Sequence, residues 1–256
     1  MKFRKEKDSM GQLNVPENAL YGATTHRALL NFPISDLRFN RTFIKSIAEI
    51  KRCAAETNLE LGTIEKNISD EIIKAAEAVS EGKYDEEFVV DIFQTGSGTS
   101  TNMNANEVIS NVAIKNLGGV VGSRSPVHPN DHVNKGQSSN DVIPTAIHIA
   151  GCVGITKSLI PSLEKLKNSL SEKSEQFWGV IKTGRTHLQD ATPIRLGQEF
   201  LGYSGQIEES IKRAKNSLSE LSILALGGTA VGTGIGMQKG FSKKVIEKLS
   251  KRFEIN

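Results

Sequence analysis

The sequence predicts a mainly α-helical protein, with a mixed helical and loop region first and long helices after it. Three observations lead to this prediction. Apolar residues recur at helical spacing from Phe43 onward, strand patterns are few and short, and two helical patterns of about thirty residues occupy the later half. Helices of that length exceed the usual globular range of roughly 10–14 residues. We therefore expect them to pack along their whole length in a bundle that several chains build together.

In the N-terminal half we expect irregular structure up to about residue 40, because glycine and proline interrupt every period, at Gly11, Pro16, Gly22 and Pro33. The next segment is predicted to be a helix with one apolar face, at Phe43, Ile47, Ile50 and Ala54. A second helix is predicted over residues 69–81, with Ser69 as its N-cap and Gly82 at the C′ position. A third is predicted over residues 104–116, before Gly118-Gly119.

In the later half a helix is expected after Asn140-Asp141, with Pro144 in its first turn and a kink at Pro161. Its apolar stripe consists of Leu159, Leu163, Leu166 and Leu170. A second stripe follows Pro193 and consists of Phe200, Ile207, Ile211, Ala214, Leu218 and Leu221. A last helix is expected from the cap Ser242, and one strand over residues 178–182. We place the domain boundary at Gln137, which gives domains 1–137 and 138–256.

Composition excludes several classes of function. The chain has 32 basic and 29 acidic residues, a balance too even for a nucleic-acid or membrane-surface protein. Two cysteines without a CxxC motif predict no disulfide scaffold and a reducing cytoplasm. The N-terminus lacks the apolar region of a secretory signal, and no run of about 18 apolar residues occurs. We expect a cytoplasmic protein without nucleic-acid or membrane partners.

The first polar cluster is the glycine- and hydroxyl-rich stretch at residues 94–102. Its alternating glycines allow a ligand to approach the backbone, and the helix that follows offers N-terminal amides to an anion. Ser97, Gly98 and Thr99 are therefore candidates for binding a carboxylate. No Gly-Lys-Ser/Thr follows, which excludes a Walker loop, and the third glycine of a dinucleotide fingerprint is missing. A glycine-rich turn capped by serine and threonine remains the alternative.

The second cluster combines residues 128–134 with Gln137-Ser138-Ser139-Asn140-Asp141. It offers amide, hydroxyl and imidazole donors to a ligand, although Asn140-Asp141 can equally be a helix cap. His128 and His132 have the spacing of metal ligands. Pro129 interrupts a continuous helix between them, however, and no acidic or cysteine partner is obvious, so we expect no metal.

The third cluster is the stretch Gly184-Arg185-Thr186-His187, which precedes a long helical pattern. An unperturbed imidazole exchanges protons near neutral pH, so His187 is a candidate acid or base, although a lone histidine is more often structural. Arg185 can bind a carboxylate or a structural partner. We interpret the glycine-rich residues 227–234 as a tight connection between helices.

The order of these clusters is more informative than any one of them. The strings TGSGTSTNMNANEV, PVHPNDHVN, QSSND, GRTHLQDATP, LGQEF and GGTAVGTG follow one another. Together with the opening MGQLNVPENALYGATTHRALLNFPIS, they resemble the fumarase/aspartase superfamily, and most closely its class II fumarate hydratases. The resemblance runs from about Lys2 to the last residues.

The resemblance implies a fold and a set of site residues. It implies an N-terminal domain followed by helices of a central bundle, in which four chains assemble and three contribute to each site. One substrate carboxylate would bind to Ser97, Gly98 and Thr99. Further donors would be Ser138, Ser139, Asn140 and Thr186, and His187 would act with a water in proton transfer. A secondary anion site would consist of His128, Pro129, Asn130 and Asp131.

The implied reaction is the reversible hydration of fumarate to (S)-malate through a carbanion whose charge spreads onto a carboxylate. It implies no metal and no organic cofactor. Aspartate ammonia-lyase is the alternative with the same fold. Thr95-Gly96-Ser97-Gly98 favours the hydratase, because ammonia-lyases usually read Gly-Gly-Ala-Gly there, and residues 138–140 and 227–229 point the same way. Residues 100–106 and 194–199 resemble the ammonia-lyases instead.

Part of the family's site has no counterpart in this sequence. The serine-rich loop that carries the proposed carbon-acid base is absent, and so is the acid that orients the catalytic histidine. We therefore expect the chain to be an N-terminal portion of such an enzyme, either truncated or the product of a split gene. A different class of function stays open, namely a non-catalytic assembly subunit or inactive fragment.

Overall fold

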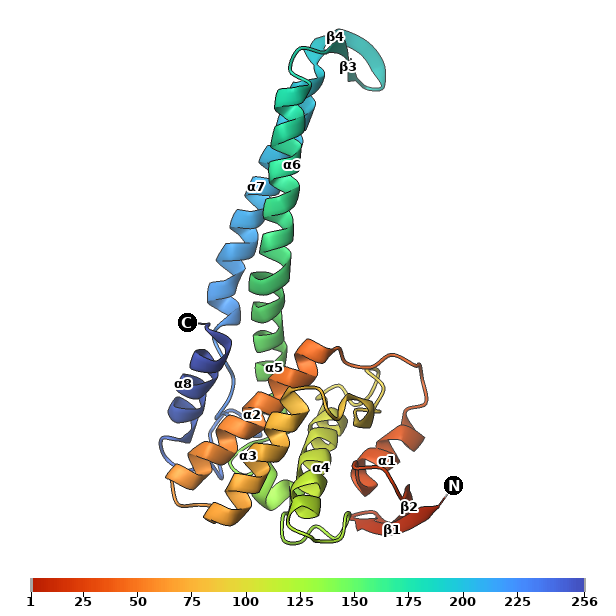
Figure 1. Cartoon of the computed structure of the whole chain (residues 1–256), viewed down its shortest axis with the longest axis vertical. Helices are drawn as coiled ribbons and strands as arrows, with labels where there is room; N and C mark the ends of the chain where they lie inside the picture. Colours follow the sequence, from red (N-terminus) through yellow and green to blue (C-terminus); the bar gives the residue numbers. More distant parts are fainter. Residues whose placement is uncertain (1, 256) are drawn as a thin grey trace. The chain divides into compact units, whose positions relative to one another are not determined.

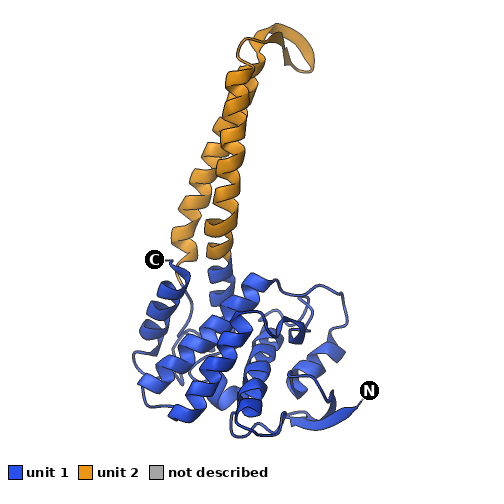
Figure 2. Cartoon of the chain, in the orientation of Figure 1, with its two compact units in different colours: residues 1–150, 224–256 blue, residues 151–223 orange. Residues whose placement is uncertain are grey.

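The structure is a computed structural model that describes residues 2–255. It is mainly helical, as predicted, and divides into two compact units (Figure 2). Unit 1 combines the residues up to Ala150 with those from Leu224 onward, and unit 2 is Gly151–Ile223. The division into domains 1–137 and 138–256 remains a prediction from the sequence.

The N-terminal segment contains regular elements up to Asn31, where the expectation of irregular structure is wrong, whereas residues 32–40 are irregular as expected. Strands β1 (Phe3–Asp8) and β2 (Gly11–Pro16) form an antiparallel hairpin, and helix α1 (Ala23–Asn31) follows. The inward-facing side chains of β1 include Glu6 and Asp8, which are buried against partners instead of an apolar core. Hydrophobic alternation therefore cannot reveal this strand.

Helix α1 has no capping side chain of its own. The carboxylate of Glu107, on helix α4 (Thr99–Asn116), accepts hydrogen bonds from the amides of Gly22, Thr24 and Thr25 at 2.9–3.0 Å. It also accepts one from the Thr25 hydroxyl at 2.6 Å. A buried carboxylate thus satisfies the first amides of α1 and ties the helix to α4.

Replacing Glu107 by Gln is expected to lower the free energy of unfolding by about 2 kcal/mol, because bonds to a charged acceptor are lost and an amide N–H faces donors. Urea denaturation measures this. The matched control is Glu86→Gln, which lies outside this network; an equal effect of the two substitutions would contradict the role given to Glu107.

The core of unit 1 lies between helices α2 (Arg41–Glu60), α3 (Lys66–Ser80) and α4, which lie side by side in Figure 1. It contains Ile47, Ile50, Ile72, Val79, Val108 and Ile109, all fully buried. Helix α2 confirms the predicted apolar face. Helix α3 begins three residues before the predicted cap Ser69, whose hydroxyl instead donates to the Ala55 carbonyl at 3.0 Å. Gly82 has φ +90° at the C′ position, as predicted.

Helix α4 begins at Thr99, earlier than predicted. Its first turn is polar and has no apolar period, so the sequence pattern does not reveal it. A 3₁₀ turn η1 (Asp85–Glu87) and a π-helical turn η2 (Pro129–Val133) flank it in sequence. Helix α8 (Phe241–Phe253) packs on α2, where Lys244 and Lys248 donate to Glu60 at 2.8 and 2.7 Å. The predicted cap Ser242 is not the N-cap of α8, and its hydroxyl donates to the Leu226 carbonyl.

Helix α5 (Ser139–Gly154) continues through a π-helical turn η3 (Ile155–Leu159) into α6 (Ile160–Gln176). Pro144 lies inside α5 and not in its first turn, which corrects that prediction. Pro161 is the second residue of α6 and follows the π-helical turn η3 closely, so a helical irregularity lies next to the predicted kink. Residues 139–176 form the one described helix whose length and composition would suffice to cross a membrane, which is weak evidence by itself.

Unit 2 consists mainly of α6 and α7 (Leu196–Leu221), which pack against each other, and of a hairpin between them (Figure 2). The hairpin pairs β3 (Ile181–Thr186) with β4 (Gln189–Arg195). The predicted strand at residues 178–182 is thus displaced, and β4 was missed because Pro193 interrupts its pattern. Several large apolar side chains of this unit are exposed, among them Leu159, Leu166, Leu201, Tyr203 and Ile223.

Candidate functional site

The N-terminus of α4 presents unpaired backbone donors. Gly98 is its N-cap in the left-handed conformation (φ +66°), and no side chain caps it there. Gln94 Oε1 accepts from the Thr101 amide at 2.8 Å, but among residues 2–255 the amides of Thr99 and Ser100 have no acceptor. The exposed hydroxyls of Ser97 and Thr99 lie 2.9 Å apart beside them. Such an end suits an anion.

Gly98 also fixes where this helix begins relative to α5. A Cβ atom at this position would lie 2.9 Å from Cγ2 of Ile143, so only glycine allows the close approach. The positive φ adds a second reason, because side chains with a Cβ atom seldom adopt that conformation. The absence of a side chain at Gly98 therefore allows the loop at residues 97–99 to lie directly against α5.

Replacing Gly98 by Ala is expected to destabilise unit 1 by about 2 kcal/mol, through left-handed strain and the contact with Ile143. Gly96→Ala is the matched control in the same loop, since a Cβ atom there would meet nothing within 4 Å. Chemical denaturation of both variants measures the difference. Equal stabilities would contradict the tight fit at Gly98.

The start of α5 is organised by Asp141, which is 1% exposed. Its Oδ1 accepts from the Ser138 amide at 2.9 Å. Because α5 begins at Ser139, Asn140 and Asp141 lie inside its first turn and do not precede the helix as the predicted cap. Asp141 Oδ2 accepts from the amides of Gly227 and Thr229 at 3.0 and 2.8 Å. Asn140 Nδ2 also donates to the Ala230 carbonyl at 2.7 Å. The glycine-rich segment after residue 226 is thus attached to the predicted substrate-binding residues, a contact that the sequence did not reveal.

A hydrogen bond joins the two predicted substrate-binding clusters. Asn102, in the first turns of α4, donates from Nδ2 to the Ser139 hydroxyl at 3.0 Å. The oxygen of the same amide accepts from Lys51 Nζ at 2.7 Å. Lys51 is fully buried on α2, and burial lowers its pKa to about 7, while the charge of Asp141 acts in the opposite direction. Sequence reasoning missed Lys51. The available signal was a single lysine four residues after Ile47 on an apolar helix face.

The predicted secondary anion site is one short segment, in which His128 caps the π-helical turn that Pro129 begins. His128 Nδ1 accepts from the amides of Asn130 and Asp131 at 3.2 and 3.1 Å. The Asp131 carboxylate lies 3.2 Å from the same nitrogen and is largely exposed. These amides are thus occupied by the imidazole. Nδ1 of His132 accepts from the His128 amide, which fixes the orientation of this second ring.

Thr186 and His187 belong to unit 2. Thr186 pairs with Gln189, and His187 and Leu188 form the two-residue turn of the hairpin, both exposed. Their φ angles are +49° and +62°, a conformation that asparagine and glycine adopt more readily. Arg185 pairs with Asp190 across the hairpin at 3.3 Å. A histidine at a strained exposed turn is a candidate functional residue.

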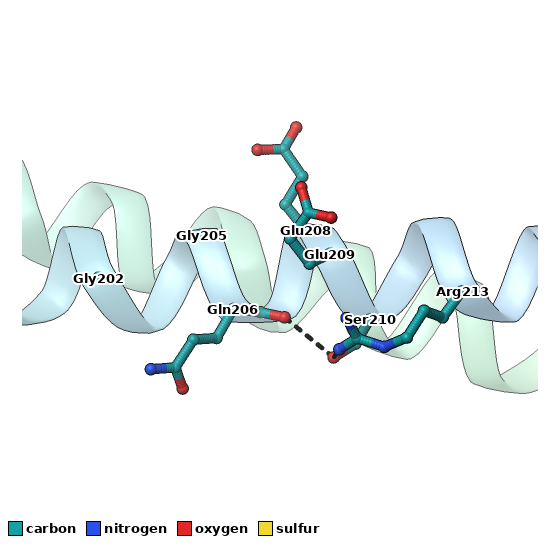
Figure 3. A pocket seen from close by; sticks show the side chains of 7 residues that line it. All are labelled: Gly202, Gly205, Gln206, Glu208, Glu209, Ser210 and Arg213. Carbon is teal, nitrogen blue, oxygen red and sulfur yellow. Dashed lines mark hydrogen bonds between the residues drawn. The ribbon is translucent and has the colours of Figure 1, made fainter.

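Unit 2 also has an open hollow of about 730 Å³ along α7, shown in Figure 3. Its lining contains none of the predicted site residues and consists of Gly202, Gly205, Gln206, Glu208, Glu209, Ser210 and Arg213. The Ser210 hydroxyl donates to the Gln206 carbonyl at 2.9 Å, so it is already occupied within the helix. The two glycines leave the α7 backbone accessible.

The chain thus combines long paired helices in unit 2 with two adjoining hydroxyl-rich helix starts in unit 1. The sequence matches the family described as Lyase over residues 11–255, and the chain belongs to this lyase family. This confirms the family expected from the motifs. The class II fumarate hydratase of Halobacterium salinarum is 53% identical over 239 residues, which are 93% of this chain and 51% of that protein. The mitochondrial fumarate hydratase of Danio rerio is 51% identical over 97% of this chain and 49% of its own length.

Solved structures of fumarases and fumarate lyases are similar to this chain as well. The class II fumarase of Schistosoma mansoni has a TM-score of 0.95 and 44% identity, and the match covers 99% of this chain and 53% of that chain. A fumarate lyase:delta crystallin from Brucella melitensis gives a TM-score of 0.95 at 39% identity. The chain spans about half the length of the curated relatives it matches.

Proposed function

We propose that this chain is part of a class II fumarate hydratase, which adds water reversibly to fumarate and yields (S)-malate. The observation that carries the proposal is the hydrogen-bonded junction between Asn102 and Ser139, which brings two hydroxyl-rich helix starts together in unit 1. The names of the relatives support the same reaction.

The chemistry requires fixed donors around a carboxylate. Removal of a proton beside that carboxylate spreads negative charge onto its oxygens, so donors aimed at these oxygens stabilise the carbanion more than the substrate. Thr99 and Ser100 offer free amides, and Ser97 and Thr99 offer hydroxyls. Because Ser139 Oγ accepts from Asn102, its own proton is directed to another partner, which we assign to the substrate.

His187 is assigned to proton transfer with a water, and Thr186 to substrate binding. Both lie at the hairpin of unit 2, and the serine-rich loop expected from the family does not occur in this sequence. We propose that sites are completed between chains of a homotetramer. The exposed apolar side chains of α6 and α7 and the accessible backbone at Gly202 and Gly205 support helix packing between chains.

The remaining predictions belong to the same proposal. No cofactor or metal takes part, and His128, Pro129, Asn130 and Asp131 form a secondary anion site. The complete protein is placed in the cytoplasm, in keeping with the free and buried thiols of Cys53 and Cys152.

The test follows the ultraviolet absorbance of fumarate. The purified chain is incubated with fumarate alone and then with the second half of a class II relative. Fumarate loss only in the mixture supports a split or incomplete enzyme. Loss without any added chain would contradict the requirement for the missing loop. Formation of fumarate from aspartate would favour the ammonia-lyase, and inactivity despite assembly would favour a non-catalytic subunit.

A further inference from the structure

Lys51 is a buried cation that none of the assigned roles uses. It projects from α2, is 0% exposed, and donates through Nζ to three side-chain amide oxygens. These are Asn102 Oδ1 at 2.7 Å, Asn134 Oδ1 at 2.8 Å and Gln137 Oε1 at 3.0 Å. The first belongs to α4 and the other two to the segment before α5, so one ammonium group joins three parts of unit 1.

The ammonium group fixes which way these amides face. A lysine has three donors and no acceptor, so each amide must turn its oxygen towards Nζ and its NH₂ group elsewhere. For Asn102 that leaves Nδ2 to donate to Ser139 Oγ at 3.0 Å. For Asn134 it leaves Nδ2 to donate to the Gln137 carbonyl at 3.2 Å. The hydroxyl of Ser139 is thus held as an acceptor towards Asn102 and keeps its proton for an outside partner.

Lys51 also places a positive charge near substrate-binding residues that are themselves neutral. The residues assigned to the substrate in unit 1 carry hydroxyls, amides and backbone N–H groups, whereas fumarate is a dianion. All three Lys51 donors are occupied, so its charge acts through Asn102 and Ser139 and not by direct contact. Burial lowers the pKa of Lys51, and the carboxylate of Asp141 on α5 acts in the opposite direction and favours the ammonium form.

We infer that Lys51 is a positioning residue, which holds the start of α4 and residues 134–139 together and directs the Ser139 hydroxyl towards a substrate carboxylate. The inference rests on the proposed function for the identity of the ligand. The arrangement of the loops around Lys51 does not depend on the identity of the ligand.

Hydrogen exchange of the purified chain tests the arrangement without substrate. In Lys51→Met the amides at residues 134–139 and at the start of α4 are expected to exchange at least ten times faster, while α1 is unchanged. Lys45→Met, an exposed lysine on the same helix, is the matched control and is expected to change neither. Unchanged exchange at residues 134–139 would overturn the inference, and so would a uniform increase throughout unit 1, which indicates general unfolding.

Nuclear magnetic resonance then tests the link to a ligand, with Lys51→Met used to assign the Lys51 signal. Fumarate is expected to raise the pH at which Lys51 titrates, whereas sodium chloride at matched ionic strength is not. A lysine with a purely structural role would titrate at the same pH in both. If fumarate binds, as shown by shifts at Thr99 and Ser139, but leaves the Lys51 titration unchanged, the inference is overturned. If fumarate causes no shift at all, the ligand identity fails, and the exchange result alone decides whether Lys51 positions the loops.

Discussion

Replacing His187 by Asn is expected to lower turnover by about 10²-fold or more, the usual contribution of positioned proton transfer. Asparagine keeps the polarity and tolerates the positive φ of the turn, so the hairpin should survive while the titratable group is lost. The effect should fall on kcat more than on KM, because the proton moves only in the chemical step.

The assay is fumarate consumption by an assembled enzyme that contains this chain. Lys182→Gln is the control, since Lys182 lies on the same hairpin and pairs with Glu199 at 2.6 Å. Loss of activity in both variants would indicate damage to the hairpin. A near-normal rate of His187→Asn would remove His187 from the mechanism.

Replacing Asp141 by Ala is expected to lower the free energy of unfolding by about 4 kcal/mol, because two buried amides and one partly buried amide lose their acceptor and each unsatisfied donor costs about 1–3 kcal/mol. The amides belong to Ser138, Gly227 and Thr229, so both the start of α5 and the glycine-rich segment should loosen. Asp141→Asn retains one oxygen acceptor and should have an intermediate effect.

Urea denaturation measures the loss, and Asp131→Ala is the matched control. The Asp131 carboxylate is 76% exposed, so its removal should change stability by no more than about 0.5 kcal/mol. Similar stabilities of the Asp141 and Asp131 variants would contradict the role of Asp141 as the acceptor that joins the start of α5 to the glycine-rich segment.

The helices with apolar faces could be predicted from the sequence because burial imposes their period. The face of α2 at Phe43, Ile47 and Ile50 is an example. The β1–β2 hairpin could not, because its buried side chains include Glu6 and Asp8, whose partners outside the hairpin are the Ala23 amide and the Arg27 guanidinium. The predicted helix caps were wrong for a related reason. Ser69 and Ser242 are plausible caps by position, yet both donate to carbonyls of other elements.

The candidate site was predictable in its residue types and not in its connections. Ser97, Thr99 and Ser139 stand out as hydroxyls beside helix starts. The bond from Asn102 to Ser139 and the bonds of Lys51 join residues 37 to 86 positions apart, a pairing that no local pattern contains. The same holds for Asp141 and Gly227, which lie 86 residues apart.

The central proposal is that this chain carries the N-terminal half of a fumarate hydratase site. A chimera tests it most directly, in which residues 11–255 of this chain replace the matching half of the Halobacterium salinarum class II fumarate hydratase. The chimera is predicted to consume fumarate, to form (S)-malate, and to produce no fumarate from aspartate. A chimera that folds and assembles but leaves fumarate untouched, or that acts on aspartate instead, would contradict the proposal.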